Sequence, residues 1–240
     1  MKCASLLLLS LCAQLMQAQY PPVVHENDSI RLEYSLVAVE DSIYKRSMFK
    51  NDILIEVLQL KDRHPIGAYK EYYDDGTLLG TGTFNATGQQ DGFWKTFHRN
   101  GRLSNRRFYN NGVLEGQTSA FYANGQLKAQ GSYEAQKHHY VVARHSTRRA
   151  VESKVGAWVY FHPNGQLKEK GHYWQGKTAL VTPEERQEEE DELGEYGYYF
   201  KHDLKDGVWK VWDKEGTLIK EEIYTKGELI EVIYAPEERP

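Results

Sequence analysis

Histidines and carboxylates are the side chains of this chain that could do chemistry, so their spacing is the first thing to test. The candidates for a metal site are His138, His139, His145, His162 and His172. None of them shows the spacing of zinc ligands, and no cysteine outside the N-terminal segment is available as a further ligand. We therefore expect no metal site.

Carboxylates gather in one run between Glu184 and Glu195. A glycosidase needs two carboxyl groups held in a fixed cleft with different environments, and an acidic run in an expected loop does not provide them. The chain also shows no glycine-rich phosphate loop, no nucleophile elbow and no Ser-His-Asp order. The sequence predicts a protein that is not an enzyme, with no catalytic residue and no cofactor.

The N-terminus has the pattern of a secretory signal peptide over residues 1–19. Lys2 precedes a leucine-rich run, and small and polar residues follow from Ala13, with cleavage expected at or near Ala18. The apolar run is shorter than the roughly 18 to 20 residues of a transmembrane helix, and no later segment reaches that length. We expect an exported protein, periplasmic or extracellular, with no transmembrane segment.

Both cysteines, Cys3 and Cys12, lie inside this leader, so the processed chain would have no thiol for a disulfide or for catalysis. The segment ending at Cys12 resembles a lipoprotein cleavage box, but Leu11 stands where a small residue is needed. Lipoprotein anchoring through Cys12 is therefore less favoured than release of the processed chain. The formal net charge of −4 argues against nucleic acid as a partner, since that usually needs a basic surface.

A repeat dominates the rest of the chain. Two glycines nine residues apart recur five times: Gly67 with Gly76, Gly92 with Gly101, Gly116 with Gly125, Gly156 with Gly165, and Gly207 with Gly216. Positions are counted below as offsets from the first glycine of each repeat. Leucine stands at offset 11 in all five repeats, and Phe or Tyr stands at offset 17. Self-similarity of this kind is the signature of a repeat fold.

Aromatic residues also mark two further offsets. Offset 2 holds Tyr69, Trp94, Thr118, Trp158 and Trp209, and offset 5 holds Tyr72, Phe97, Phe121, Phe161 and Trp212. The second glycine follows Asn or Asp in four repeats, and Asn-Gly or Asp-Gly between apolar runs predicts a two-residue hairpin turn with positive φ at both residues. Each repeat is thus expected to be strand, turn, strand.

Pairing around such a turn places offsets 2, 11 and 17 on one face of a sheet and offset 5 on the other. The offset 5 residues are the candidate binding face. Aromatic residues at a fixed repeat offset more often pack than bind ligands, yet exposed flat rings are also what a glycan-binding face uses. The sequence leaves both interpretations open.

Residues 20–66 are expected to form strands that begin the sheet and shield its first edge. A degenerate sixth repeat is expected to start near Ile43, with Phe49, Asp52, Leu54 and Leu60 at the aromatic, turn, leucine and last apolar positions. The array itself spans residues 67–234, and residues 235–240 form a C-terminal tail.

The repeats around Gly92-Phe93-Trp94 and Gly156-Ala157-Trp158, each followed by Asn-Gly and Leu, resemble the bacterial variant of the MORN repeat, found in proteins filed as YwqK-type antitoxins. The resemblance covers about residues 67–234. It implies a meandering antiparallel sheet of hairpins used for binding, with no shared catalytic residues. The expected fold is therefore an all-β, single elongated domain, a MORN-like array of repeated hairpins.

Two insertions of opposite charge interrupt the array, near residues 136–154 and 177–204. The first is rich in Lys and Arg and the second in Glu and Asp. They could pair with each other, form a solvated acidic loop without function, or bind a charged partner. Tyr140 to Arg144 and Tyr196 to Lys201 could each add a strand to the sheet.

These observations predict a non-catalytic scaffold that binds an unknown protein or a cell-envelope component. The first alternative is a carbohydrate-binding module that uses the aromatic residues at offset 5. The second is an antitoxin-like protein or one that binds lipid head groups. The basic insertion favours lipid binding, and the net negative charge argues against it.

Overall fold

The computed structural model describes residues 30–38, 43–142, 145–175 and 203–236, and for residues 30–38 and 135–151 the backbone alone. These residues form strands and no helix, which confirms the all-β class. The strands are β1 (Ile30–Ala38), β2 (Ile43–Lys50), β3 (Ile53–Lys61), β4 (His64–Tyr72), β5 (Leu78–Phe84), β6 (Gln90–Phe97), β7 (Leu103–Asn110), β8 (Val113–Leu114), β9 (Gly116–Phe121), β10 (Leu127–Val142), β11 (His145–Phe161), β12 (Leu167–Tyr173), β13 (Lys205–Trp212), β14 (Leu218–Thr225) and β15 (Glu228–Tyr234).

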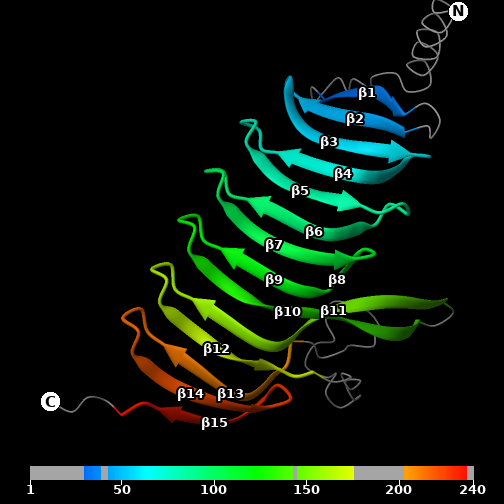
Figure 1. Cartoon of the computed structure of the whole chain (residues 1–240). Coiled ribbons are helices and arrows are strands. Elements are labelled where there is room, and N and C mark those ends of the chain that lie inside the picture. Colours follow the sequence, from blue (N-terminus) through cyan, green and yellow to red (C-terminus); the bar gives the residue numbers. More distant parts are fainter. Residues whose placement is uncertain (1–29, 39–42, 143–144, 176–202, 237–240) are drawn as a thin grey trace, which may run out of the picture. The chain divides into compact units, whose positions relative to one another are not determined.

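The chain divides into two compact units, residues 1–104 and 105–240. In the first unit β1 to β6 pair antiparallel in chain order. In the second, the order is β7, β9 and then β10 to β15, with the short β8 paired to β7 beside this path. Within each unit consecutive strands lie side by side, with β8 beside this path, as Figure 1 shows, so the predicted meander of hairpins is confirmed.

The turn inside each repeat differs from the predicted two-residue turn. In the first repeat the Gly76 N–H donates to the Tyr73 carbonyl at 3.0 Å, and the Tyr73 N–H donates to the Thr77 carbonyl at 2.8 Å. This is a three-residue loop in which only the glycine has positive φ, and the other repeats repeat it. It is a type I turn followed by a left-handed glycine, a combination that fits the twist of the strands as well.

The longer loop moves the leucine of offset 11 to the other face. Phe161 pairs with Leu167 and Trp212 pairs with Leu218, so each leucine lies beside the aromatic residue of offset 5. The prediction that leucine shares a face with offset 2 is wrong. An irregularity next to this pair restores the register, so Trp158 still opposes Gly171, and the rings at offsets 2 and 17 share a face as predicted.

The first glycine of each repeat produces a bulge where one repeat meets the next. Gln130 pairs with Val159 and Ser132 with Val155, so a single residue of β10, Gly131, stands opposite Gly156, Ala157 and Trp158. Gly156 has a φ of 65°, a conformation that costs other residues energy. The extra residues bend β11 and aim the indole of Trp158 across the neighbouring strand.

The indole at offset 2 packs directly on a glycine at offset 15 of the preceding repeat. A Cβ atom added to Gly131 would lie 2.2 Å from the ring of Trp158, and one added to Gly171 would lie 2.3 Å from the ring of Trp209. The indole N–H of Trp209 then donates to the His172 carbonyl at 3.0 Å. Gly82 and Trp94 form the same contact in the first unit.

The core of the second unit is built from these rings. Trp158, Tyr173 and Trp209 are buried, and Trp209 is 0% exposed. Tyr173 lies edge-on to both indoles, with centroid distances of 5.9 Å to Trp158 and 4.9 Å to Trp209. We call this side of the sheet the core face and the opposite side the ladder face. Edge-to-face contacts of this kind stabilise aromatic cores beyond their buried area.

The region before the array forms a hairpin where the degenerate repeat was expected. β2 and β3 pair, with Phe49 opposite Leu54. Their turn, Asn51-Asp52, has two residues, both with positive φ. Two-residue turns with positive φ also occur at Asn111-Gly112 and Lys226-Gly227. Neither is the turn inside one of the five repeats.

The first insertion lengthens two existing strands and adds none. Gln136 pairs with Val151 and Val142 with His145, so β10 and β11 continue together past the rest of the sheet. In the second insertion, residues 176–202 lie outside the described residues, as do Tyr196 to Lys201. At the described margins one ion pair joins the two insertions, because Lys154 Nζ lies 3.3 Å from Asp203 Oδ2.

Candidate functional site

The predicted binding residues lie on the ladder face within each unit. In the second unit Phe121, Phe161 and Trp212 stand on β9, β11 and β13, and all three are partly exposed. Tyr72 and Phe97 hold the same offset in the first unit and are also partly exposed. Their side chains are neither buried like the core-face rings nor fully in solvent, which leaves them available for contact with a ligand.

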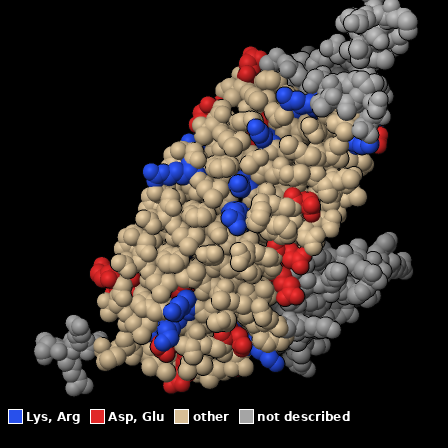
Figure 2. All heavy atoms as spheres, viewed as in Figure 1, with Lys and Arg blue, Asp and Glu red and all other residues tan. Residues whose placement is uncertain are grey.

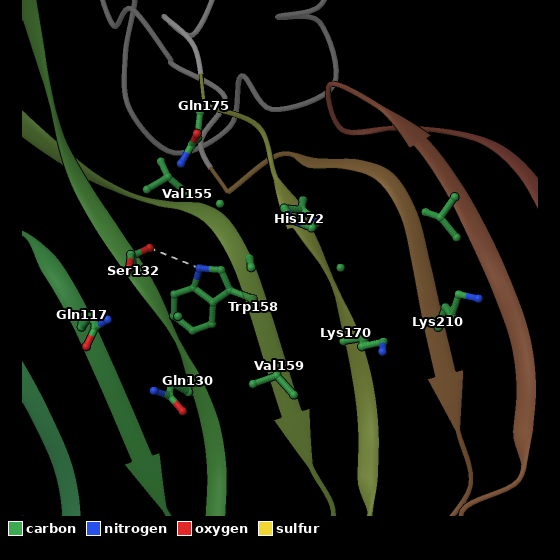
Figure 3. A pocket seen from close by; sticks show the side chains of 15 residues that line it. Gln117, Gln130, Ser132, Val155, Trp158, Val159, Lys170, His172, Gln175 and Lys210 are labelled. Carbon is green, nitrogen blue, oxygen red and sulfur yellow. Dashed lines mark hydrogen bonds between the residues drawn. The ribbon is translucent and has the colours of Figure 1, made fainter.

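A groove of about 580 Å³ lies on the same side of the second unit's strands as these rings, which do not line it. Ala157 and Val159 line it and alternate with the core-face residues, so they lie on the same side of β11 as Phe161. Figure 3 shows the groove spread across β9 to β13. Its polar lining consists of Gln117, Gln130, Ser132, Lys170, His172, Gln175 and Lys210. The volume is typical of a site for a small molecule or for part of a chain.

The floor of the groove is backbone and small side chains. Gly131, Gly156, Gly171 and Ala157 contribute to it. Gly131 and Gly171 leave room for the indoles of the core face, whereas Gly156 has a positive φ and lies against Gln175.

Two lysines stand directly opposite each other in the groove. Lys170 of β12 pairs with Lys210 of β13. Lys210 Nζ lies 2.7 Å from Glu221 Oε1, and Lys170 Nζ lies 5.5 Å from the centroid of the Trp212 ring. In Figure 3 the Lys210 side chain points away from Lys170. Like charges directly opposite in a sheet are unfavourable, and the two ammonium groups avoid each other.

A like-charged pair also stands directly opposite in the first unit, where Glu56 of β3 pairs with Glu71 of β4. Figure 2 shows Lys, Arg, Asp and Glu scattered over the side of the molecule in view, with uncharged residues between them. On the core face Lys205 lies 4.3 Å from the Trp209 ring centroid and 2.5 Å from Glu169 Oε1. Burial lowers the pKa of Lys205, but the hydrogen bond to Glu169 and its charge outweigh burial and raise that pKa. A lysine held in its charged form is a packing group and not a nucleophile.

The histidines considered for a metal site do not come together. His162 Nε2 donates a 3.0 Å hydrogen bond to the Trp212 carbonyl, and His172 lines the groove. His138, His139 and His145 lie where the side chains are not described. Within the described side chains, no group of three His, Cys, Asp or Glu is placed to hold a metal.

In three repeats the residue at offset 6 bonds to the next repeat. The Tyr122 hydroxyl donates to the Phe161 carbonyl at 2.9 Å, and Tyr73 makes the equivalent bond to Phe97 at 2.8 Å. His162 reaches Trp212 in the same way. Each bond holds the backbone of an offset 5 residue, so this column positions the ladder rings, a role that the sequence pattern alone did not show.

The turns are joined as well. Asn164 Oδ1 accepts the Gln166 N–H at 3.1 Å, and its Nδ2 donates to the Lys214 carbonyl of the next turn at 2.7 Å. Asn124 makes the same pair of bonds with Gln126 and Pro163. The asparagine is therefore selected for having both a donor and an acceptor, and not for positive φ as predicted.

Comparison with known proteins supports this geometry. A model of the MORN repeat variant matches residues 65–86, 114–135, 154–175 and 205–226. The chain carries MORN repeats. Each match begins two residues before the first glycine of a repeat. No curated protein matches the chain in a sequence comparison.

One of the five repeats lies outside the segments that the family model matches. The repeat that begins at Gly92 has the same three-residue loop, with the Gly101 N–H donating to the His98 carbonyl at 2.8 Å. Its offset 15 residue is Arg107, where three of the four matched repeats have glycine. The next repeat then has Thr118 and no tryptophan at offset 2, so the missing glycine and the missing indole go together.

The sequence pattern missed the groove. It predicted the ladder residues by their offset, but most of the groove's side chains stand at offsets 1, 3, 14 and 16, which the pattern did not single out. The signal that could have found it is the pair of lysines at offset 14 of one repeat and offset 3 of the next. The described residues contain no helix that is long and apolar enough to cross a membrane.

Proposed function

We propose that this MORN-repeat protein is an exported scaffold that binds a protein or a cell-envelope component on the ladder face of its second unit. MORN repeats are generally non-catalytic and serve in binding, which supports a role of this class. The observation that carries the proposal is that the groove and the rings of Phe121, Phe161 and Trp212 lie on one side of consecutive strands. Extended repeat surfaces of this kind suit large ligands.

Export is part of the proposal, with the leader pattern of residues 1–19 as its support. Bacterial origin and the YwqK-type variant are likewise proposed, on the resemblance of the repeats. In cells that express the full chain, we expect a shortened form outside the cytoplasm. A variant that lacks residues 2–19 should stay in the cytoplasm at full length, and equal distribution of both forms would contradict export.

Binding is tested by capture from envelope fractions. The full chain is compared with a variant in which Phe121, Phe161 and Trp212 are changed to Ser, and with Tyr234→Ser as control, since Tyr234 is 70% exposed and lies on β15. We expect the ladder variant to lose a partner that the control retains, with unchanged circular dichroism for both. Equal capture by all three proteins would show that this face is not the binding site.

The alternatives predict different outcomes of the same assay. A lipid-binding protein would float with anionic vesicles whether or not Phe121, Phe161 and Trp212 are intact. An antitoxin-like protein would capture one cytoplasmic protein and nothing from the envelope fraction. Either result would replace the proposed function.

A further inference from the structure

The groove of the second unit combines an opposed pair of lysines with uncharged polar and small apolar side chains, and this combination indicates the chemistry of a ligand. We propose that the groove binds an acidic polysaccharide, a sugar chain that carries ring carboxylates, with one carboxylate held between Lys170 and Lys210. The inference rests on the proposed function, because it names the partner class of the same face.

The opposed lysines carry the charge argument. Lys170 and Lys210 are cross-strand partners, an arrangement that weakens the sheet unless an anion lies between the two ammonium groups. Without a ligand Lys210 is held by Glu221 at 2.7 Å, while Lys170 lies over the Trp212 ring. A local arrangement that opposes folding is expected where function selects it. A carboxylate that enters the groove gains two cationic partners at once.

The uncharged lining indicates sugar hydroxyls. Gln117 and Gln130 line the groove, and their side-chain amides make no hydrogen bond with the described residues. An amide both donates and accepts, which matches a hydroxyl group that does the same. The apolar faces of sugar rings need flat or small apolar surfaces, and Ala157, Val159 and Val208 supply these in the floor.

The position of the groove argues against an extended peptide. A peptide that adds to a sheet pairs its backbone with a free strand edge. This groove lies over the face of β9 to β13, where each strand is already paired on both sides. A sugar chain has no need of backbone pairing and can lie across the strands.

Net charge makes the test specific. The whole chain has a formal charge of −4, so general attraction to a polyanion is not expected. Binding would therefore depend on the local lysine pair. Two ion contacts also predict a shallow salt dependence, much weaker than that of a protein with a basic stripe.

The experiment measures binding of the full chain to polygalacturonate and to its fully methyl-esterified form, which has the same sugar backbone without charge. We expect the acidic polymer to bind at least about tenfold more tightly than the ester. Lys170→Gln and Lys210→Gln should each weaken binding about tenfold. Glu221→Gln should strengthen it, because Lys210 loses the competing carboxylate.

Lys168→Gln is the matched control. Lys168 is exposed on the same strand and does not line the groove, so its loss changes the net charge equally. An equal loss of binding in this control would show general charge attraction and overturn the proposal. If the ester binds as tightly as polygalacturonate, the carboxylate is not recognised. If polyglutamate binds as tightly, the sugar is not recognised, and either result overturns the proposal.

Two further outcomes separate this inference from the proposed function. If neither polymer binds but the ladder variant still loses its envelope partner, the scaffold role stands and the polysaccharide is wrong. If polygalacturonate binds only after Glu188, Glu189 and Glu190 are changed to Gln, the acidic insertion of the chain itself competes for the lysine pair. That result would overturn the proposal that the groove normally binds an external polysaccharide.

Discussion

At the scale of single residues, the glycines at offset 15 and the indoles of the next repeat form matched pairs. Gly131 lies under Trp158, Gly171 lies under Trp209, and Arg107 is instead followed by Thr118. A side chain and the space for it therefore come from different repeats. This explains why neither column is constant along the chain while their combination is.

Gly131→Ala tests this pairing. The new methyl group would overlap the Trp158 ring, so we expect a loss of about 2 kcal/mol in the free energy of unfolding by urea. Arg107→Ala at the same offset is the control and should change stability by less than about 0.5 kcal/mol, because Arg107 is exposed. If both variants unfold alike, the glycine is not selected by the indole.

Glu222 gives the core face a dependence on pH. Its carboxylate lies 2.6 Å from Lys220 Nζ and accepts a 2.9 Å hydrogen bond from the Tyr224 hydroxyl. Burial raises the pKa of Glu222, but these hydrogen bonds and the charges of Lys220 and Lys205 outweigh burial and hold that pKa below its ordinary value of 4.5. The stability that Glu222 contributes is therefore present above pH 4.5 and is lost as the pH falls through the lowered pKa.

We expect Glu222→Gln to be less stable than the parent protein at pH 7 and about equally stable at pH 2.5. The glutamine keeps the size of the side chain but cannot titrate, so the variant's unfolding free energy should fall less steeply with acid. Urea denaturation at a series of pH values measures this. Parallel curves for the two proteins would mean that Glu222 does not titrate with folding.

At the scale of the element, the three-residue loop decides which side chains share a face. The motif Asn-Gly predicted a hairpin turn correctly, but the number of loop residues was wrong by one. That difference moved the leucine of offset 11 to the ladder face, beside Phe161 and Trp212. Turn chemistry is local and readable in sequence, whereas loop length and the compensating irregularity depend on how the strands pair.

Bonds between neighbouring turns are the second element-scale device. Asn164→Asp keeps the acceptor for the Gln166 N–H and removes the donor to the Lys214 carbonyl. We expect a loss of about 0.5 to 1 kcal/mol in thermal or urea unfolding. Glu215→Gln, at the same offset in the last repeat, should have almost no effect. A larger loss there would contradict the conclusion that this position stabilises the fold by bonding to the next turn.

The outer edge of β15 is a third feature of this kind. No described strand pairs with it, and Ile230 and Tyr234 are 58% and 70% exposed. Exposed apolar edge strands promote association. We expect Ile230→Lys to reduce concentration-dependent light scattering, whereas Ile219→Lys, on the paired strand β14, should reduce it less. The reverse order would exclude the edge as the cause.

At the scale of the whole molecule, sequence predicted what repeats and missed what varies. The periodic glycines and aromatic rings were enough for the all-β meander, because a column that recurs at one offset has one structural explanation. The groove is formed by residues such as Gln130 and Lys170, whose types do not recur at their offset, together with Lys210, whose offset also holds Lys70 and Lys95. Their proximity follows from strand register, and register was the part of the prediction that the loop length changed.

A repeat fold also predicts where damage stops. Trp209 is 0% exposed and contacts Tyr173 and Gly171 of the adjacent strand β12 and Lys205 of its own strand β13. Trp209→Ala should cost about 4 kcal/mol there, since it leaves a large cavity. In repeat proteins each repeat packs only against the repeats next to it. We therefore expect amide hydrogen exchange to rise in β12 to β14 while β4 and β5 keep their protection. Equal loss of protection in all of these strands would show that the array unfolds as one cooperative body and that nearest-neighbour packing does not limit the effect.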